Sequence, residues 1–198
     1  MAVTPIFSVV DTETTGFRFD KGARLLEVAV VRMDADGTIQ GTFSSLVNPG
    51  DDIDLGAIDI HGITRSMLAD APTFAEIAGD FVSIVEGTLL VAHNAPFDTP
   101  FLAGELELAG YGWPAQHVLD TLGAARFLLP GLPSYKLGAL AEHLGITFEG
   151  NAHAALADAL VTAKLHAALL AKTENLKWPD PSAIQWPRAT PSGLAKSR

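Results

Sequence analysis

The first part of the chain consists of short apolar runs separated by turn-forming residues, which is the pattern of β-strands. The runs are rich in β-branched residues and predict three strands, at Ile6–Val10, Leu25–Val31 and Thr38–Val47. The segment Asp34–Gly37 predicts a turn between the second strand and the third, and Asn48-Pro49-Gly50 breaks the pattern after the third. We therefore expect these strands to form an antiparallel meander.

Farther along the chain, helical spacing alternates with short apolar runs. Apolar residues at helical spacing predict helices at Thr73–Val85, Phe101–Ala109, Lys136–His143 and Ala154–Lys172. Short apolar runs predict two more strands, at Thr88–Ala92 and Val118-Leu119. A meander followed by alternating helices and strands indicates an α/β protein, in which a mixed sheet of antiparallel and parallel strands is flanked by helices.

Composition predicts one domain, residues 1–172, and a tail, residues 173–198. Of the 198 residues, 48% are apolar, which is enough for one sizeable core. The tail differs because its prolines forbid a regular helix, and it is the most basic part of the chain, with Trp178 and Trp186 each directly before a proline. Two interpretations stay open: a tail that is partly disordered or folds back on the core, and a partner-binding segment with two aromatic anchors.

The charge balance restricts the partners. Thirteen Lys and Arg against 23 Asp and Glu give a net charge of −10, which argues against a long basic groove for nucleic acid and against docking on anionic membranes. The sequence has no cysteine, so any metal must be held by Asp, Glu or His. It shows neither a leader pattern at its start nor an apolar run of about 18 residues, so we expect a cytoplasmic protein with no membrane partner.

Four carboxylates are expected to converge at one site. Asp11 and Glu13 are two positions apart in an extended segment, a spacing that puts both side chains on one face. Asp98 follows the strand at Thr88–Ala92, and Asp158 lies near the start of the last helix. Such a group would resist ionising together, and the hard cations Mg²⁺ and Mn²⁺ resolve that conflict because they prefer oxygen ligands.

A base is also needed if this site activates water. His153 is the candidate, because an imidazole takes up a proton near neutral pH. Five positions along a helix do not put two residues on one face, so we place His153 in the loop or first turn and Asp158 in the helix. We expect His117, His143 and His166 to be surface or core residues without a chemical role, with His143 and His166 on helix surfaces.

Three segments together resemble the motifs of the DEDDh family of 3′-to-5′ exonucleases, which share a ribonuclease H-like fold: Asp11–Gly16, His93–Asp98 and His153–Asp158. The resemblance extends over Ile6–Lys172. It implies that His153 is the general base and that two divalent ions, Mg²⁺ or Mn²⁺, are held by Asp11, Glu13, Asp98 and Asp158. The branch of these enzymes that carries a Tyr in place of this His fits less well.

The resemblance extends to the substrate. It implies that Thr14 and the Ile60-His61-Gly62 segment hold the terminal nucleotide. Asn94 and Phe97 lie within the second motif, and they line the same pocket either by contact or by packing.

Within the family, the chain resembles the epsilon proofreading subunit of bacterial DNA polymerase III, through the Asp-Thr-Glu-Thr-Thr-Gly start and the segment His61-Gly62-Ile63-Thr64. This implies the 3′ end of single-stranded DNA as substrate and a DNA polymerase subunit as a partner, bound through the C-terminal tail. The tail is short and has no clear clamp-binding motif, so a stand-alone exonuclease stays open as well. Two further alternatives stay open. One is an exoribonuclease or oligoribonuclease of the same family, and the other is a catalytically silent module that binds a polymerase.

Overall fold

The central element is a five-stranded mixed sheet. The computed structural model describes residues 5–51, 53–56, 58–113, 118–147 and 154–173. The sheet has the order β3-β2-β1-β4-β5, with bounds β1 Ile6–Thr14, β2 Leu25–Asp34, β3 Ile39–Leu46, β4 Leu89–Ala92 and β5 Leu119–Asp120. The first three strands are antiparallel neighbours, whereas β4 runs parallel to β1 and β5 runs parallel to β4. The predicted meander and the mixed α/β sheet are confirmed.

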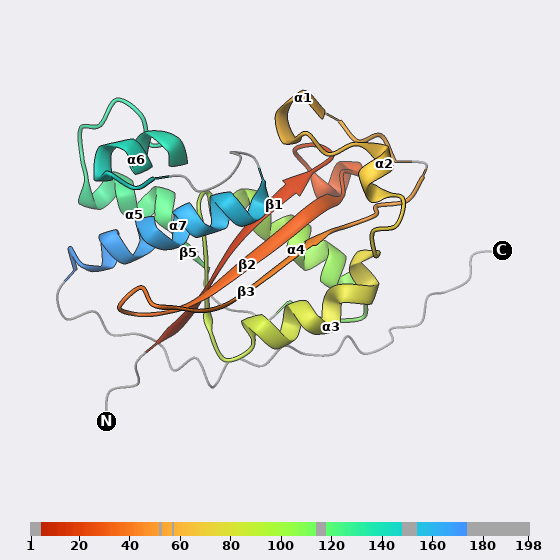
Figure 1. Cartoon of the computed structure of the whole chain (residues 1–198), viewed down its shortest axis with the longest axis horizontal. Helices are drawn as coiled ribbons and strands as arrows, with labels where there is room; N and C mark the ends of the chain where they lie inside the picture. Colours follow the sequence, from red (N-terminus) through yellow and green to blue (C-terminus); the bar gives the residue numbers. More distant parts are fainter. Residues whose placement is uncertain (1–4, 52, 57, 114–117, 148–153, 174–198) are drawn as a thin grey trace.

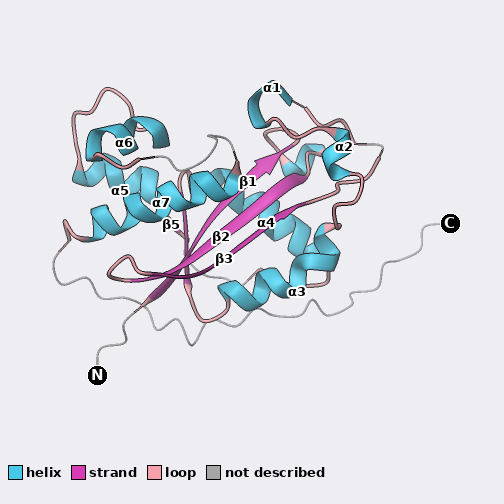
Figure 2. Cartoon of the chain, in the orientation of Figure 1, coloured by secondary structure: helices cyan, strands magenta, loops and turns pink. Residues whose placement is uncertain are grey.

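Helices cover both faces of the sheet (Figures 1 and 2). Side chains alternate along a strand, so that Val9 and Val10 lie on opposite faces. The face of Val10 packs against α3 (Phe74–Val85) and α4 (Ala95–Leu108), and the face of Val9 packs against α7 (Ala155–Leu170). Three of the residues that α7 buries against the strands are alanines, which lets its first turns lie close to the sheet: Ala155, Ala159 and Ala163.

Smaller helices complete the described part of the chain. α5 (Thr121–Leu128) and α6 (Leu137–Leu144) share an apolar cluster with the last turns of α7. The remaining elements are short: η1 (Phe19–Lys21), α1 (Ile58–His61) and α2 (Arg65–Leu68). No helix within the described ranges is both long enough and apolar enough to cross a membrane. All but the first residue of the predicted tail lies outside those ranges, so the division at residue 172 stays a prediction.

The structure differs from the sequence prediction at the start of α4 and in the helices α1, α2 and α5, which lie where no helix was predicted. The helix predicted from Phe101 begins six residues earlier, at Ala95, and α5 was not predicted. In α5 the carboxylate of Asp120 accepts hydrogen bonds from the amides of Leu122 and Gly123, and this cap turns the chain into a helix directly after the two-residue strand β5. The helix predicted over Thr73–Val85 is confirmed as α3, which has Thr73 at its N-cap position.

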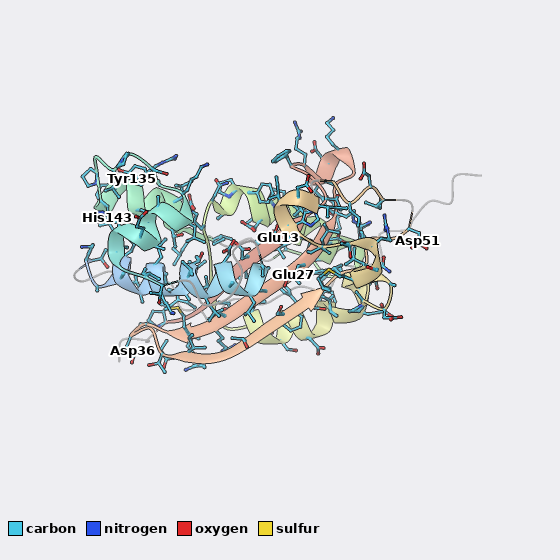
Figure 3. All side chains as sticks on the ribbon, turned by 45° about the horizontal axis from the view of Figure 1, so that its top comes forward. Glu13, Glu27, Asp36, Asp51, Tyr135 and His143 are labelled. Atoms are coloured by element: carbon cyan, nitrogen blue, oxygen red, sulfur yellow. The ribbon has the colours of Figure 1, made fainter. Side chains whose placement is uncertain are left out.

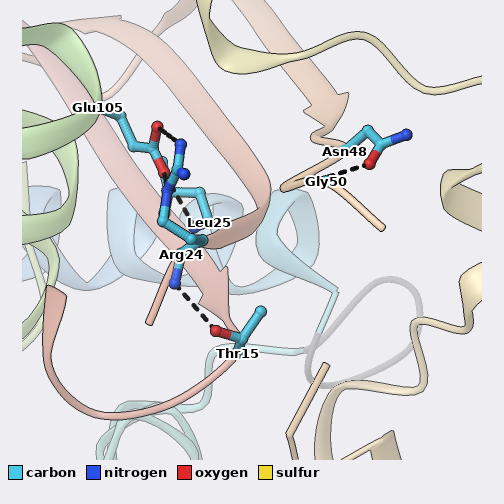
Figure 4. Close-up of polar contacts among 6 residues, drawn as sticks. All are labelled: Thr15, Arg24, Leu25, Asn48, Gly50 and Glu105. Atoms are coloured by element: carbon cyan, nitrogen blue, oxygen red, sulfur yellow. Dashed lines mark hydrogen bonds and ion pairs between the residues drawn. The ribbon is translucent and has the colours of Figure 1, made fainter. Parts of the chain in front are cut away.

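An ion pair ties α4 to the sheet (Figure 4). The guanidinium of Arg24 donates from Nε and Nη2 to the two carboxylate oxygens of Glu105, both at 2.6 Å. The side chain of Glu105 is only 2% exposed, and that of Arg24 is 28% exposed. The amide of Arg24 donates to the hydroxyl of Thr15 at 2.9 Å, so the same residue also fixes the chain just after β1.

Replacing Glu105 by Ala should lower the free energy of unfolding by about 3 kcal/mol, because the Arg24 charge is left partly buried without its partner. Glu107→Ala is the matched control, since Glu107 is an exposed glutamate on the same helix. It should change stability by less than about 0.5 kcal/mol. Urea unfolding of both variants measures the difference, and equal losses would contradict a structural role for the pair.

Candidate active site

Strand β1 carries two carboxylates on the face covered by α7. Asp11 and Glu13 share the side of the strand that holds Phe7 and Val9, because residues two apart in an extended chain point the same way. β1 is the central strand of the sheet, and both residues lie toward its C-terminal end. The same-face prediction for this pair is therefore confirmed.

Asp158 comes to the same place from α7. It is the fourth residue of that helix, and one carboxylate oxygen from each of Asp11, Glu13 and Asp158 can be chosen so that all three lie within 4.8 Å of one another. The amide of Asp158 donates to the carbonyl of Ala154 at 3.1 Å, so its backbone belongs to the first turn. The structure thus brings together residues that are far apart in the sequence.

Asp98 approaches from the other helical layer. It lies in the first turn of α4, is 4% exposed, and accepts a hydrogen bond of 2.7 Å from the hydroxyl of Thr12. The turn before it is set by Asn94, which has a positive φ of 68°. Asp120 accepts from the amide of Asn94 at 2.9 Å and thereby holds this left-handed residue in place.

Burial and mutual repulsion raise the pKa values in this cluster. Burial, and then the charges of Asp98, Asp158, Glu13 and Glu27, raise the pKa of Asp11 well above its usual value. Burial and neighbouring carboxylates raise the pKa of Glu13 to about 8. Burial raises the pKa of Asp98 to about 7, although the Thr12 hydrogen bond opposes the shift. Every charged group that contributes to the shifts of Asp11 and Glu13 is itself a carboxylate.

The donor set fits a hard divalent cation. Carboxylate oxygens are the ligands that Mg²⁺ and Mn²⁺ prefer, and a cation would remove the repulsion that keeps these groups protonated. Asp11, Glu13 and Asp158 are the residues placed to hold it, with Asp98 beside them. His153, the candidate base, lies outside the described residues, and its role stays a prediction.

Glu27 is a carboxylate of this site that the motifs did not single out. In the register of β1 and β2 it lies directly opposite Glu13, and Figure 3 shows both beside the start of α7. The signal was present in the sequence, because Glu27 is the only charged residue in the apolar run Leu25–Val31. A charge in the middle of a buried strand needs a partner or a function.

The predicted nucleotide-binding residues occupy different environments. Thr14 is half-buried and donates from its hydroxyl to the carbonyl of Gly16 at 2.7 Å. His61 is buried: its Nδ1 accepts from the amide of Ile63 at 3.0 Å, so Nε2 carries the proton that is shared with the Leu55 carbonyl at 3.1 Å. Both ring nitrogens of His61 therefore bind the chain's own backbone.

The other three nucleotide-binding candidates are more accessible. Ile60 is 58% exposed, and Asn94 is exposed at the start of α4. Phe97 is half-buried, with its ring 5.5 Å from that of Phe101. It also lines a cavity of about 370 Å³, whose other lining residues are Phe17, Arg18, Phe19, Asp20, Pro96, Pro100 and Phe101.

Two of the remaining histidines can be compared with the prediction. His143 is exposed on α6, as predicted. The prediction for His166 was wrong, because this residue is only 5% exposed. Its ring packs edge-on against that of Phe7, with 4.6 Å between the ring centroids. α7 is buried along most of its length, and burial lowers the pKa of His166 to about 4.

A mixed sheet whose central strand ends in converging carboxylates is the architecture of ribonuclease H-like nucleases. Residues 8–166 match the family model described as exonuclease, RNase_T. The chain belongs to this exonuclease family, which confirms the resemblance found in its motifs.

Relatives and solved structures agree with this assignment. The DNA polymerase III subunit epsilon of Treponema pallidum is 39% identical over 83% of this chain and 76% of that protein. A DNA polymerase III subunit epsilon-like protein of Rhodobacter capsulatus is also 39% identical, but the match spans 86% of this chain and only 25% of that protein. The nuclease domain of 3′hExo, a DEDDh family member bound to rAMP, has the same fold, with a TM-score of 0.73 at 20% identity over 94% of this chain and 98% of that domain.

The raised carboxyl pKa values predict a stability that falls as the pH rises from about 6.5 to about 8 in the metal-free protein. In this range the unfolded chain has already released the protons of Glu13 and Asp98, whose ordinary values are 4.5 and 3.8, whereas the folded chain loses them only near 8 and 7. The folded state therefore binds more protons, so increasing pH favours unfolding. Burial lowers the pKa of His166 from its ordinary 6.5 to about 4, so its opposing effect on stability is confined to pH values below this window.

Urea unfolding at several pH values in the presence of a chelator measures this slope. Glu13→Gln should flatten it, and Mn²⁺ should restore stability to the unsubstituted protein at pH 8, because a cation stabilises the ionised form. Parallel pH profiles of stability for the unsubstituted protein and Glu13→Gln would contradict the raised pKa of Glu13.

Proposed function

We propose that this chain is a metal-dependent 3′-to-5′ exonuclease that removes mononucleotides from the 3′ end of single-stranded DNA. The observation that carries the proposal is the convergence of Asp11, Glu13 and Asp158 within 4.8 Å, with the buried Asp98 beside them. Membership of the exonuclease family supports it. A short pocket that grips one chain end through metal ions needs no long basic groove, so the net charge of −10 is compatible with this substrate.

The proposed reaction is hydrolysis of the terminal phosphodiester. A water oxygen attacks the phosphorus, and the bond from phosphorus to the 3′ oxygen of the preceding nucleotide breaks. That oxygen takes up a proton from water to become the new 3′-hydroxyl, and a nucleoside 5′-monophosphate leaves. Two divalent ions bound by the carboxylates would supply positive charge for activating the water and for stabilising the leaving oxygen. In this proposal Asp11, Glu13, Asp98 and Asp158 hold those ions as carboxylates.

The remaining steps are assigned to the protein's own side chains. His153 takes the proton from the attacking water on its imidazole. The aromatic cavity lined by Phe97 and the strongly exposed Phe17 receives the terminal base by stacking, because every base offers a flat face to an aromatic ring. Thr14, Ile60, His61 and Asn94 stay candidates for contacts with the terminal nucleotide.

Relatives support DNA as the substrate. Two of them are named as DNA polymerase III epsilon or epsilon-like proteins, and by this likeness we also propose a polymerase subunit as a partner of the tail, residues 173–198. The nuclease domain bound to rAMP keeps the exoribonuclease alternative open, since it shares the fold. The two substrates differ by the 2′-hydroxyl, which a pocket either accepts or excludes.

Digestion of DNA and RNA oligomers with matched sequences, side by side in Mn²⁺, tests the substrate assignment. Single-stranded DNA should lose its 3′ nucleotides faster than RNA, with nucleoside 5′-monophosphates as products. Faster loss of RNA would replace the DNA assignment by the exoribonuclease alternative. If neither oligomer shortened while the protein remained folded, the silent polymerase-binding module would be favoured.

Replacing His153 by Ala should lower the turnover number by about 10²- to 10⁴-fold, because the proposed base is lost. Mn²⁺ affinity measured by calorimetry should stay within about twofold, since the carboxylates remain. The control is His143→Ala, which removes an exposed histidine from α6 and should leave the turnover number unchanged. Near-normal turnover in His153→Ala would refute the role of base.

A further inference from the structure

The position of Glu27 is unfavourable unless the residue has a specific partner. Its backbone lies directly opposite that of Glu13 in the antiparallel pair of β1 and β2, so the two side chains are on the same face of the sheet. Like charges at directly opposite positions of two strands destabilise the pair. Glu27 is also half-buried within a strand whose other members from Leu25 to Val31 are apolar.

The partner is the start of helix α7. The amide of Ala155 donates to Oε2 of Glu27 at 3.1 Å, across 128 positions of sequence. α7 needs this acceptor because the amides of a first helical turn have no partner within the helix, and the residue at its N-cap position, Ala154, has no side-chain oxygen. Glu27 therefore caps α7 from the neighbouring strand.

This cap is coupled to a proposed metal ligand through the helix backbone. The amides of Ala157 and Asp158 donate to the carbonyl of Ala154 at 2.9 and 3.1 Å, which closes one turn around Ala155. A group that anchors the Ala155 amide thus anchors the backbone of Asp158 relative to β2. The register of β1 and β2 then fixes that position relative to Glu13.

A second contact orients Glu27 itself. The Ala155 amide, and then the hydroxyl of Ser44 on β3, oppose the increase that burial causes in the pKa of Glu27. The carboxylate is held between an edge strand and a helix start. Glu27 is not part of the group whose oxygens lie within 4.8 Å of one another.

We propose that Glu27 is a positioning residue, which joins β2 to the first turn of α7 and so places the Asp158 carboxylate against Asp11 and Glu13. The effect that this inference predicts on the turnover number rests on the proposed function, whereas the effect it predicts on hydrogen exchange at the Ala155 amide does not. The required property is a hydrogen-bond acceptor at this position, not a negative charge. The competing role, a further metal ligand, requires the charge, so Glu27→Gln separates the two.

Three variants test the proposal in the full-length chain: Glu27→Gln, Glu27→Ala and the control Glu107→Ala, which removes an exposed glutamate from α4. Glu27→Ala should increase hydrogen exchange at the Ala155 amide about tenfold or more, because the acceptor is lost. It should weaken Mn²⁺ binding and lower the turnover number by about 10- to 100-fold, while the KM for single-stranded DNA changes little. Glu27→Gln should stay within about threefold of the unsubstituted protein in each measurement.

The outcomes separate the two roles. If Glu27→Gln loses as much Mn²⁺ affinity as Glu27→Ala, the negative charge is required and the positioning role is overturned. Unchanged exchange at Ala155 in Glu27→Ala would also overturn it. If Glu27→Ala fails to fold, Ser44→Ala is the second variant. It should also lose Mn²⁺ affinity, but less than expected for Glu27→Ala. Unchanged Mn²⁺ affinity in Ser44→Ala would contradict the proposal. If the unsubstituted protein is inactive but the variants still differ from it as expected in hydrogen exchange and Mn²⁺ affinity, only the exonuclease proposal is refuted.

Discussion

Mutual repulsion among the carboxylates of Asp11, Glu13, Asp98 and Asp158 is the constraint on which the rest of this structure depends. Burial and neighbouring acids keep the pKa of Glu13 near 8 and that of Asp98 near 7, so the folded protein holds an acidic cluster that ionises only at a cost in stability. Two divalent ions would reduce the net charge from −10 to about −6 (−10 + 4 = −6) and would remove that cost. Both the oxygen donors of the cluster and their spacing therefore fit a divalent cation.

The fold brings this unfavourable group together by packing and hydrogen bonds that lie around it. Alanines on α7 let that helix approach the strands that carry Asp11 and Glu13. On the opposite face the Arg24–Glu105 ion pair fastens α4, the helix that bears Asp98, to the sheet. The apolar core and these fixed contacts stabilise the protein enough to hold the carboxylates in place.

The prediction from sequence succeeded where local pattern and tertiary structure agree. Strand alternation is set by the backbone, so the shared face of Asp11 and Glu13 could be predicted from spacing alone. α5 was missed because its start depends on the Asp120 cap after a strand of two residues. The burial of His166 and the role of Glu27 depend on how α7 packs against β1 and β2, which a single sequence does not show. Those features come from contacts between distant segments.

Calorimetric titration with Mn²⁺ at pH 7, in two buffers of different ionisation enthalpy, tests the central claim most directly because it counts the protons released on binding. The account predicts that Mn²⁺ binds and releases about one proton or more per chain, since Glu13 and Asp98 have pKa values of about 8 and 7 before binding. Binding without proton release, or no binding at all, would contradict the claim that these carboxylates form a metal site.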